Sequence, residues 1–255
     1  MERATRRDSV DIEVVEYADA ESLAMGVAQQ LAILVAEAQT DGRIPSLVLT
    51  GGTVAAKLHA AVPGVAKARS VGSAIDWDRV DFWFGDERYV ERDSPDRNAY
   101  QARTAMLDRL RADRRIHEMP WADGEFGEDV EAAAAAYARE LGPDPHFDVL
   151  MLGVGPDGHC ASLFPGRPEV LSPASVLAVR DSPKLPPTRI SLGLSTLGRA
   201  DEVWFLVAGA EKAQTAARAD RGNGPGGHPA CGPRGTRRTV LFVDREAAAQ
   251  LPRGS

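Results

Sequence analysis

The chain has 255 residues, which is enough for one large α/β domain or two small ones. Its composition is ordinary for a globular protein, with 44% apolar and 26% charged residues, and this excludes a wholly disordered chain or a fibrous repeat. The net charge of −7 argues against general nucleic-acid binding, which needs a basic face, but a few local basic groups can still hold a small anionic ligand.

The cysteine content and the N-terminal segment indicate where the protein works. Only two cysteines occur, Cys160 and Cys231, and their spacing matches neither a zinc site nor a disulfide scaffold. The N-terminal segment lacks the apolar core of a signal peptide, and no window reaches the roughly 18 continuous apolar residues that a membrane helix needs. We therefore expect a cytoplasmic protein without membrane contact. The final LPRGS is native or a cloning remnant and carries no argument.

Strands and helices are predicted to alternate along the chain, because short apolar runs bounded by glycine alternate with segments of helical periodicity. In chain order these are strand 10–17, helix 20–38, strand 46–50, helix 54–62, strand 80–84, helix 98–110, helix 129–141, strand 149–152, strand 172–180, strand 189–194, strand 202–208, helix 210–219 and strand 239–243. Loops are predicted at 122–128, in the proline-rich SPKLPPT and at 221–238, which is rich in glycine and arginine.

This order implies a three-layer αβα fold, in which helices cover both faces of a mostly parallel, Rossmann-like sheet. We find no internal repeat and no convincing linker, so residues 1–255 are expected to form a single domain. In such sheets, ligands bind beyond the carboxyl ends of the strands. Four strand ends carry unusual residues, at 51–53, 85–88, 155–159 and 209–212.

The first of these ends, Thr50-Gly51-Gly52-Thr53, allows two interpretations. A double glycine after a strand can be a simple tight turn. Ahead of a helix it can also present backbone N–H groups and the positive end of the helix dipole to a phosphate. It is neither a Walker loop nor a G-x-G-x-x-G motif. Lys212, behind another glycine turn, is either a surface lysine or a second contact for the same phosphate.

The cluster Asp86, Glu87 and Arg88 is equally open on sequence grounds. Charge runs of this kind are usually solvated. Burial beside Trp83 and Phe84 would instead require that the charges be paired or used for ligand contact.

His159 is the strongest single candidate for catalysis. It follows a buried strand and precedes Cys160-Ala161-Ser162, which we interpret as the start of a helix. An imidazole there can take a proton from water, with Asp157 or Asp86 holding its tautomer. Metal binding is disfavoured because no second histidine lies at ligand spacing. Cys160 as a nucleophile is also disfavoured, because its neighbours supply no activating base.

Four motifs in order resemble the 6-phosphogluconolactonase family. GVGPDGHCASLFPG is similar to the family's G-x-G-P-D-G-H-T-A-S-L-F-P-G, with Cys160 in place of threonine. The others are VDFWFGDERYVERDSPDRNAYQARTAML, DSPKLPPTRISLGLSTL and VWFLVAGAEKA, so that the resemblance spans nearly the whole chain. It implies a single α/β domain related to glucosamine-6-phosphate deaminase. The implied activity is hydrolysis of 6-phospho-D-glucono-1,5-lactone to 6-phospho-D-gluconate in the pentose phosphate pathway.

The resemblance also implies roles for individual residues. His159 would be the general base that activates water against the lactone carbonyl, with Asp157 and Asp86 orienting it or the water. Seven further residues would bind the phosphate and the sugar hydroxyls: Gly51, Gly52, Thr53, Arg88, Lys184, Arg189 and Lys212. No metal or other cofactor is expected, the only partner is the sugar-phosphate lactone, and the chain is expected to be a monomer or a weak homo-oligomer.

Two departures from the family pattern and two rival functions bear on this hypothesis. TGGTVAAKL stands where the family often has Ser-Gly-Gly-Ser-Thr-Pro, and 221–238 is richer in glycine and arginine than its counterpart. A glucosamine-6-phosphate deaminase shares the G-x-D-G-H turn but follows it with an Asn-Glu-Pro-Gly stretch, where this chain has no carboxylate. A non-catalytic sugar-phosphate sensor would not need the Asp157 and His159 pair.

Overall fold

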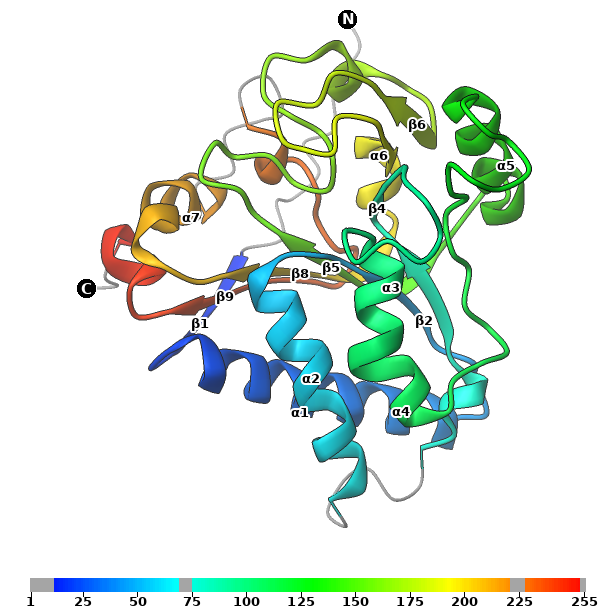
Figure 1. Ribbon diagram of the computed structural model, residues 1–255. Helices are drawn as coiled ribbons and strands as arrows, with labels where there is room; N and C mark the ends of the chain where they lie inside the picture. Colours follow the sequence, from blue (N-terminus) through cyan, green and yellow to red (C-terminus); the bar gives the residue numbers. More distant parts are fainter. Residues whose placement is uncertain (1–11, 69–74, 221–227, 253–255) are drawn as a thin grey trace, which may run out of the picture.

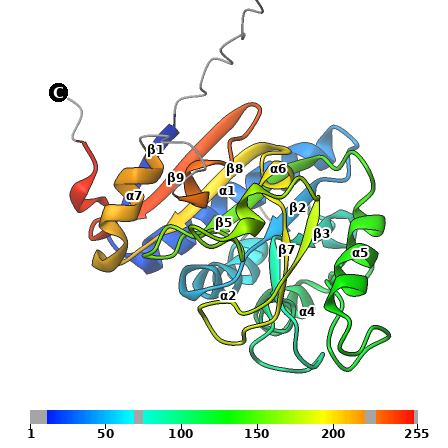
Figure 2. The same cartoon turned by 90° about the horizontal axis from the view of Figure 1, so that it is seen from above.

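The computed structural model describes residues 12–68, 75–220 and 228–252. A six-stranded, fully parallel sheet forms its centre, in the order β1-β9-β8-β5-β2-β3 (Figures 1 and 2). Its strands are β1 (Ile12–Tyr17), β2 (Ser46–Leu49), β3 (Asp81–Phe84), β5 (Phe147–Gly153), β8 (Ala200–Val207) and β9 (Arg238–Asp244). Because all six run the same way, the loops that follow them meet at one edge of the sheet.

Helices cover both faces of this sheet, as the sequence predicts (Figure 1). The first face carries α1 (Ala20–Thr40), α2 (Thr53–Lys67), α3 (Asn98–Ala102) and α4 (Asp108–Leu110). The second face carries α5 (Val130–Leu141), α6 (Leu194–Leu197) and α7 (Ala213–Asp220). Alternate side chains of the central strand β5 lie on opposite faces of the sheet. Val149 and Met151 pack against the first helix layer, and Leu150 and Leu152 pack against the second.

A second, antiparallel sheet of three short strands also lies over the second face. It consists of β4 (Asp86–Arg88), β7 (Arg189–Leu192) and β6 (Val176–Val179). The charged cluster Asp86-Glu87-Arg88 is thus a strand paired with β7, which the sequence analysis did not predict. This pairing brings the cluster and the residues around Arg189 to one place.

Within the described residues the predicted elements are found, with shifts at their ends, while residues 10–11 of the first strand and 221–227 of the last predicted loop lie outside the described part of the chain. The helix after Gly52 continues through Pro63 and Gly64 to Lys67, although both residues usually weaken a helix. The helix predicted at 98–110 is continuous but contains a π-helical turn, Arg103–Leu107, between α3 and α4. Strand β6 is shorter than the predicted 172–180, because residues 172–175 lie outside it, between β6 and a 3₁₀ turn at Pro168–Leu171.

Candidate active site

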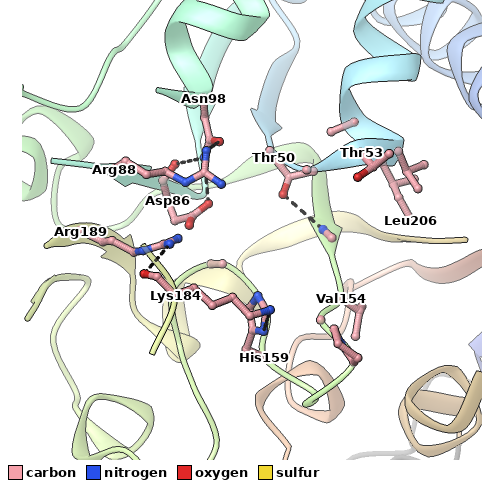
Figure 3. Close-up of a pocket in the computed structure, with 18 of the residues that line it drawn as sticks. Thr50, Thr53, Asp86, Arg88, Asn98, Val154, His159, Lys184, Arg189 and Leu206 are labelled. Atoms are coloured by element: carbon pink, nitrogen blue, oxygen red, sulfur yellow. Dashed lines mark hydrogen bonds between the residues drawn. The ribbon is translucent and has the colours of Figure 1, made fainter. Parts of the chain in front are cut away.

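A cleft of about 270 Å³ lies at the edge where β2, β5 and β8 end (Figure 3). Every predicted site residue except Asp157 lines this cleft, and Asp157 is hydrogen-bonded to one of the lining residues, His159. Its lining is Thr50, Gly51, Gly52, Thr53, Val54, Ala55, Asp86, Arg88, Asn98, Gly153, Val154, Gly155, Pro156, His159, Ala161, Lys184, Leu185, Arg189, Leu206 and Lys212. Residues that the sequence analysis named at four strand ends thus lie around one cleft.

The loop that follows β5 folds back on itself and presents His159 to the cleft. Gly155 N donates to His159 O at 3.0 Å, and Gly158 N donates to Gly155 O at 2.9 Å. The imidazole lies across Gly155, where an added Cβ would stand 2.0 Å from the ring Cε1 atom. Glycine at 155 is thus required for the ring to occupy this place.

The predicted helix start at Cys160-Ala161-Ser162 is wrong. Cys160 instead forms isolated antiparallel bridges with Val154 and Leu163, and Ala161 has a positive φ of 50°. Hydrogen bonds of the returning loop therefore take the place of a helical turn. Cys160 is also fully buried in the core beneath the loop, so its thiol is not placed to attack a ligand in the cleft.

His159 is half-buried and forms a 2.5 Å hydrogen bond from Nδ1 to Asp157 Oδ1. A carboxylate accepts only, so Nδ1 carries the proton and Nε2 is left with the basic lone pair. Burial lowers the pKa of His159 below its ordinary 6.5, although the hydrogen bond and charge of Asp157 act in the opposite direction. Burial would raise the pKa of Asp157, but its bond to His159 brings it below 3.8. The pair is therefore a neutral imidazole held by a carboxylate at neutral pH.

Lys184 brings a positive charge beside this pair. Its Nζ lies 3.4 Å from His159 Nδ1 and 3.9 Å from Asp157 Oδ1. Arg189 also lines the cleft, but its guanidinium donates to the carbonyls of Lys184, Leu185 and Pro186 at 3.0 to 3.1 Å. Much of the hydrogen-bonding capacity of Arg189 thus holds the loop that carries Lys184.

Asp86 and Arg88 are joined by a residue that the sequence analysis gave no role, Asn98. Asn98 Nδ2 donates to Asp86 Oδ1 at 3.1 Å, and its Oδ1 accepts from Arg88 Nη1 at 2.9 Å. Ser162 Oγ donates to the other carboxylate oxygen of Asp86 at 2.6 Å. Asp86 therefore acts on His159 through its charge across the cleft, while its own hydrogen bonds go to Asn98 and Ser162.

Glu87, between these two residues, is fully buried and is not among the described residues that line the cleft. Its carboxylate accepts the backbone N–H groups of Arg88, Asn98 and Ala99 at 2.7 to 2.8 Å. Arg97 Nη2 lies 3.7 Å away. Burial raises the pKa of Glu87 to about 7, against the charge of Arg97 and the N–H donors, which lower it. Asp86 and Glu87 are thus buried, Arg88 is half-buried, and all three are hydrogen-bonded, which decides between the two interpretations of the cluster.

The glycine turn after β2 leads directly into α2. Gly52 is the N-cap residue, with a φ of 100° and no side-chain cap, so the first-turn N–H groups of α2 have no capping side chain. An added Cβ on Gly51 would stand 1.9 Å from Asn98 Oδ1. The turn is tied to the loop of His159, because Thr50 Oγ1 accepts the N–H of Gly153 at 3.2 Å.

Lys212 reaches the cleft from the 3₁₀ turn Ala210–Lys212 after β8. Burial lowers its pKa below 10.5, and the charge of Glu211 acts in the opposite direction. Within residues 12–68, 75–220 and 228–252, no group of three or more His, Cys, Asp or Glu is placed to hold a metal ion. No helix in this part of the chain is long and apolar enough to cross a membrane.

Comparison with known proteins places the chain in a family. The family model of glucosamine-6-phosphate isomerases/6-phosphogluconolactonase matches residues 18–242. The chain belongs to this family. It is 46% identical to a 6-phosphogluconolactonase of Streptomyces coelicolor over 94% of this chain and 95% of that protein. It is 43% identical to one of Mycobacterium tuberculosis over 86% of this chain and 95% of the other.

Solved structures of the glucosamine-6-phosphate isomerase/6-phosphogluconolactonase family have the same fold. The 6-phosphogluconolactonase of Trypanosoma brucei superposes with a TM-score of 0.80 at 25% identity, covering 96% of this chain and 100% of the other. A monomeric glucosamine-6-phosphate deaminase superposes with a TM-score of 0.77 at 19% identity. The predicted αβα fold and the resemblance are confirmed.

The sequence analysis assigned no role to three polar residues whose side chains form hydrogen bonds in or beside the cleft: Thr50, Asn98 and Ser162. Asn98 had a usable signal, because it lies in the same quoted motif as Asp86 and Arg88. Thr50 and Ser162 also lie in quoted stretches, but each contributes one hydroxyl whose partner lies far away in the sequence, at Gly153 and Asp86. Local spacing carries no information on such contacts.

Proposed function

We propose that the protein is a 6-phosphogluconolactonase, which hydrolyses 6-phospho-D-glucono-1,5-lactone to 6-phospho-D-gluconate. The observation that carries this proposal is the neutral imidazole of His159, held by Asp157 in a cleft that also contains cationic side chains and the start of α2. The named relatives, which match almost end to end, support the same substrate.

In the proposed reaction, His159 Nε2 takes a proton from a water molecule in the cleft. The water oxygen bonds to the lactone carbonyl carbon and forms a tetrahedral intermediate with a negatively charged oxygen. The bond from this carbon to the ring oxygen then breaks, and the imidazolium returns its proton to the departing ring oxygen, which becomes a hydroxyl. Asp157 keeps the tautomer and stabilises the imidazolium while it exists.

Lys184 is the cation nearest to the base, and its position supports a role at the reacting carbonyl. A positive charge there stabilises the oxyanion, which bears charge only in the intermediate and the neighbouring transition states. Arg189 supports this arrangement by holding the backbone of residues 184–186.

The phosphate is assigned to the opposite side of the cleft, at Gly51, Gly52 and Thr53. The uncapped first turn of the 15-residue helix α2 offers N–H donors and a positive dipole end, which suit a dianion. Arg88, oriented by Asn98, and Lys212 supply the matching charges. Binding energy from this remote group would position the lactone against the base.

A deaminase is the competing function within the family. Its ring-opening glutamate would have to come from the stretch that follows the histidine turn, where this chain has Ser162, Leu163 and Phe164, all buried. We propose in addition that the protein acts in the cytoplasm, without metal or other cofactor, as a monomer or weak homo-oligomer with one site per chain.

The test is hydrolysis of freshly prepared 6-phosphogluconolactone by the purified protein in a pH-stat, with the spontaneous rate subtracted. We expect rapid acid release that a chelator such as EDTA does not change. Release at the spontaneous rate would contradict the proposal, and loss of activity with EDTA would contradict its metal-free form. Ammonia release from glucosamine 6-phosphate, measured in parallel, would indicate the deaminase instead.

A further inference from the structure

Three hydrogen-bond donors from later in the chain contact the backbone carbonyls of the loop that carries Asp157 and His159. Thr215 Oγ1 donates to Pro156 O at 2.9 Å, and Ala230 N donates to Gly158 O at 3.1 Å. Between them, Nδ1 of His228 lies 3.3 Å from Asp157 O. Three consecutive carbonyls of the loop are thus engaged by α7 and by the described end of the segment rich in glycine and arginine.

The tautomer of His228 follows from its second contact. Nε2 of His228 lies 2.7 Å from Nη1 of Arg218, and a guanidinium can only donate. Nε2 must therefore accept, which places the ring proton on Nδ1. Nδ1 then donates to the carbonyl of Asp157. Arg218 thus keeps His228 in the form that can bond to the loop.

The ring of His228 also packs closely against the loop. Gly158 has a φ of 86°, and a Cβ added there would stand 2.2 Å from His228 Nδ1. Gly158 is the residue between Asp157 and His159. The ring of His228 therefore lies directly against the peptide that joins the two members of the pair. His228 itself is not among the described residues that line the cleft.

We propose that His228, oriented by Arg218, is a positioning residue for the Asp157 and His159 pair. Its Nδ1–H fixes the carbonyl of Asp157 and, through it, the angle at which the Asp157 carboxylate meets the imidazole of His159. This inference rests on the proposed function. In this proposal His228, in the described part of the segment rich in glycine and arginine, acts on the reaction through Asp157 and His159. His228 itself contacts neither the substrate nor the reacting atoms.

Two conservative substitutions separate the two contacts of His228. In His228→Asn the side-chain amide nitrogen takes the place of Nδ1 and can donate to Asp157 O, but it cannot reach Arg218. In His228→Gln the amide lies near the place of Nε2 and can bond to Arg218, but no donor faces Asp157. His228→Ala removes both contacts.

The experiment measures kcat and KM for lactone hydrolysis in the wild type and the three variants, with thermal unfolding as a check on folding. We expect His228→Ala and His228→Gln to lower kcat about tenfold with KM within about twofold, because a small misplacement of the base slows chemistry more than binding. His228→Asn should keep kcat within about twofold of the wild type.

Wild-type kcat in the alanine variant, or equal losses in the asparagine and glutamine variants, would overturn the inference. If His228→Ala does not fold, the comparison of asparagine with glutamine decides alone. A wild-type protein that fails to hydrolyse the lactone would instead refute the proposed function.

Discussion

The contacts of the His159 imidazole set the pH range in which the site can work. The ring must be neutral to accept a proton, and burial lowers its pKa below 6.5, which favours the neutral form. Lys184 adds to this effect, because a nearby cation disfavours a protonated imidazole. In the proposed reaction, the same residue thus lowers the pKa of the base and stabilises the oxyanion.

We predict that kcat/KM falls on the acid side with a midpoint below pH 6.5, since this ratio reports the pKa of the base in the free enzyme. Lys184→Met should move the midpoint upward, because removal of the positive charge favours the protonated ring. The pH dependence of initial rates measures both. A midpoint that stays in place or moves downward in Lys184→Met would contradict the assigned interaction.

At the scale of elements, the first turn of helix α3 is capped by a residue of strand β4. Arg97, the N-cap of α3, makes no side-chain cap, and Glu87 of β4 accepts the N–H groups of Asn98 and Ala99 instead. This arrangement sets Asn98, and through it Asp86 and Arg88, in the cleft. Sequence reasoning missed it because a cap is normally sought in the residues next to the helix.

We predict that Glu87→Gln lowers the free energy of unfolding by about 2 kcal/mol, because a neutral amide replaces the carboxylate that accepts three backbone N–H groups and Arg97 keeps only Glu118 as an anionic partner. Urea denaturation measures the change. The matched control is Asp144→Asn, which removes the exposed ion pair with Arg199 and should change stability by less than about 0.5 kcal/mol. Similar effects in both variants would show that Glu87 is not the buried cap described here.

On the scale of the whole molecule, two hydrophobic layers share one sheet, as the alternating side chains of β5 show. The parallel core could be predicted because strands buried on both faces are continuous apolar runs, such as Val149 to Leu152. The small antiparallel sheet could not. Its strand β4 consists of Asp86, Glu87 and Arg88, and burial of the two carboxylates depends on hydrogen bonds from the start of α3 and from Ser162, which no strand periodicity indicates.

The shared sheet predicts one cooperative unfolding transition, as expected for the proposed single domain. Leu150→Ala, at a fully buried site of the central strand, should lower the stability of the whole transition by about 3 kcal/mol. Leu171→Ala, at a site that is 77% exposed, is the control and should have little effect. Two separate transitions in calorimetry, only one of them shifted by Leu150→Ala, would contradict a single domain.

The proposed reaction depends on His159 as the base, and His159→Ala tests this role most directly. In a pH-stat with the spontaneous rate subtracted, we predict a loss of kcat of at least about a hundredfold. Binding of 6-phosphogluconate, measured by calorimetry, should remain within about threefold, because the phosphate contacts are intact. His146→Ala, at an exposed histidine outside the cleft, should keep the wild-type rate. An unchanged rate in His159→Ala would contradict the central claim.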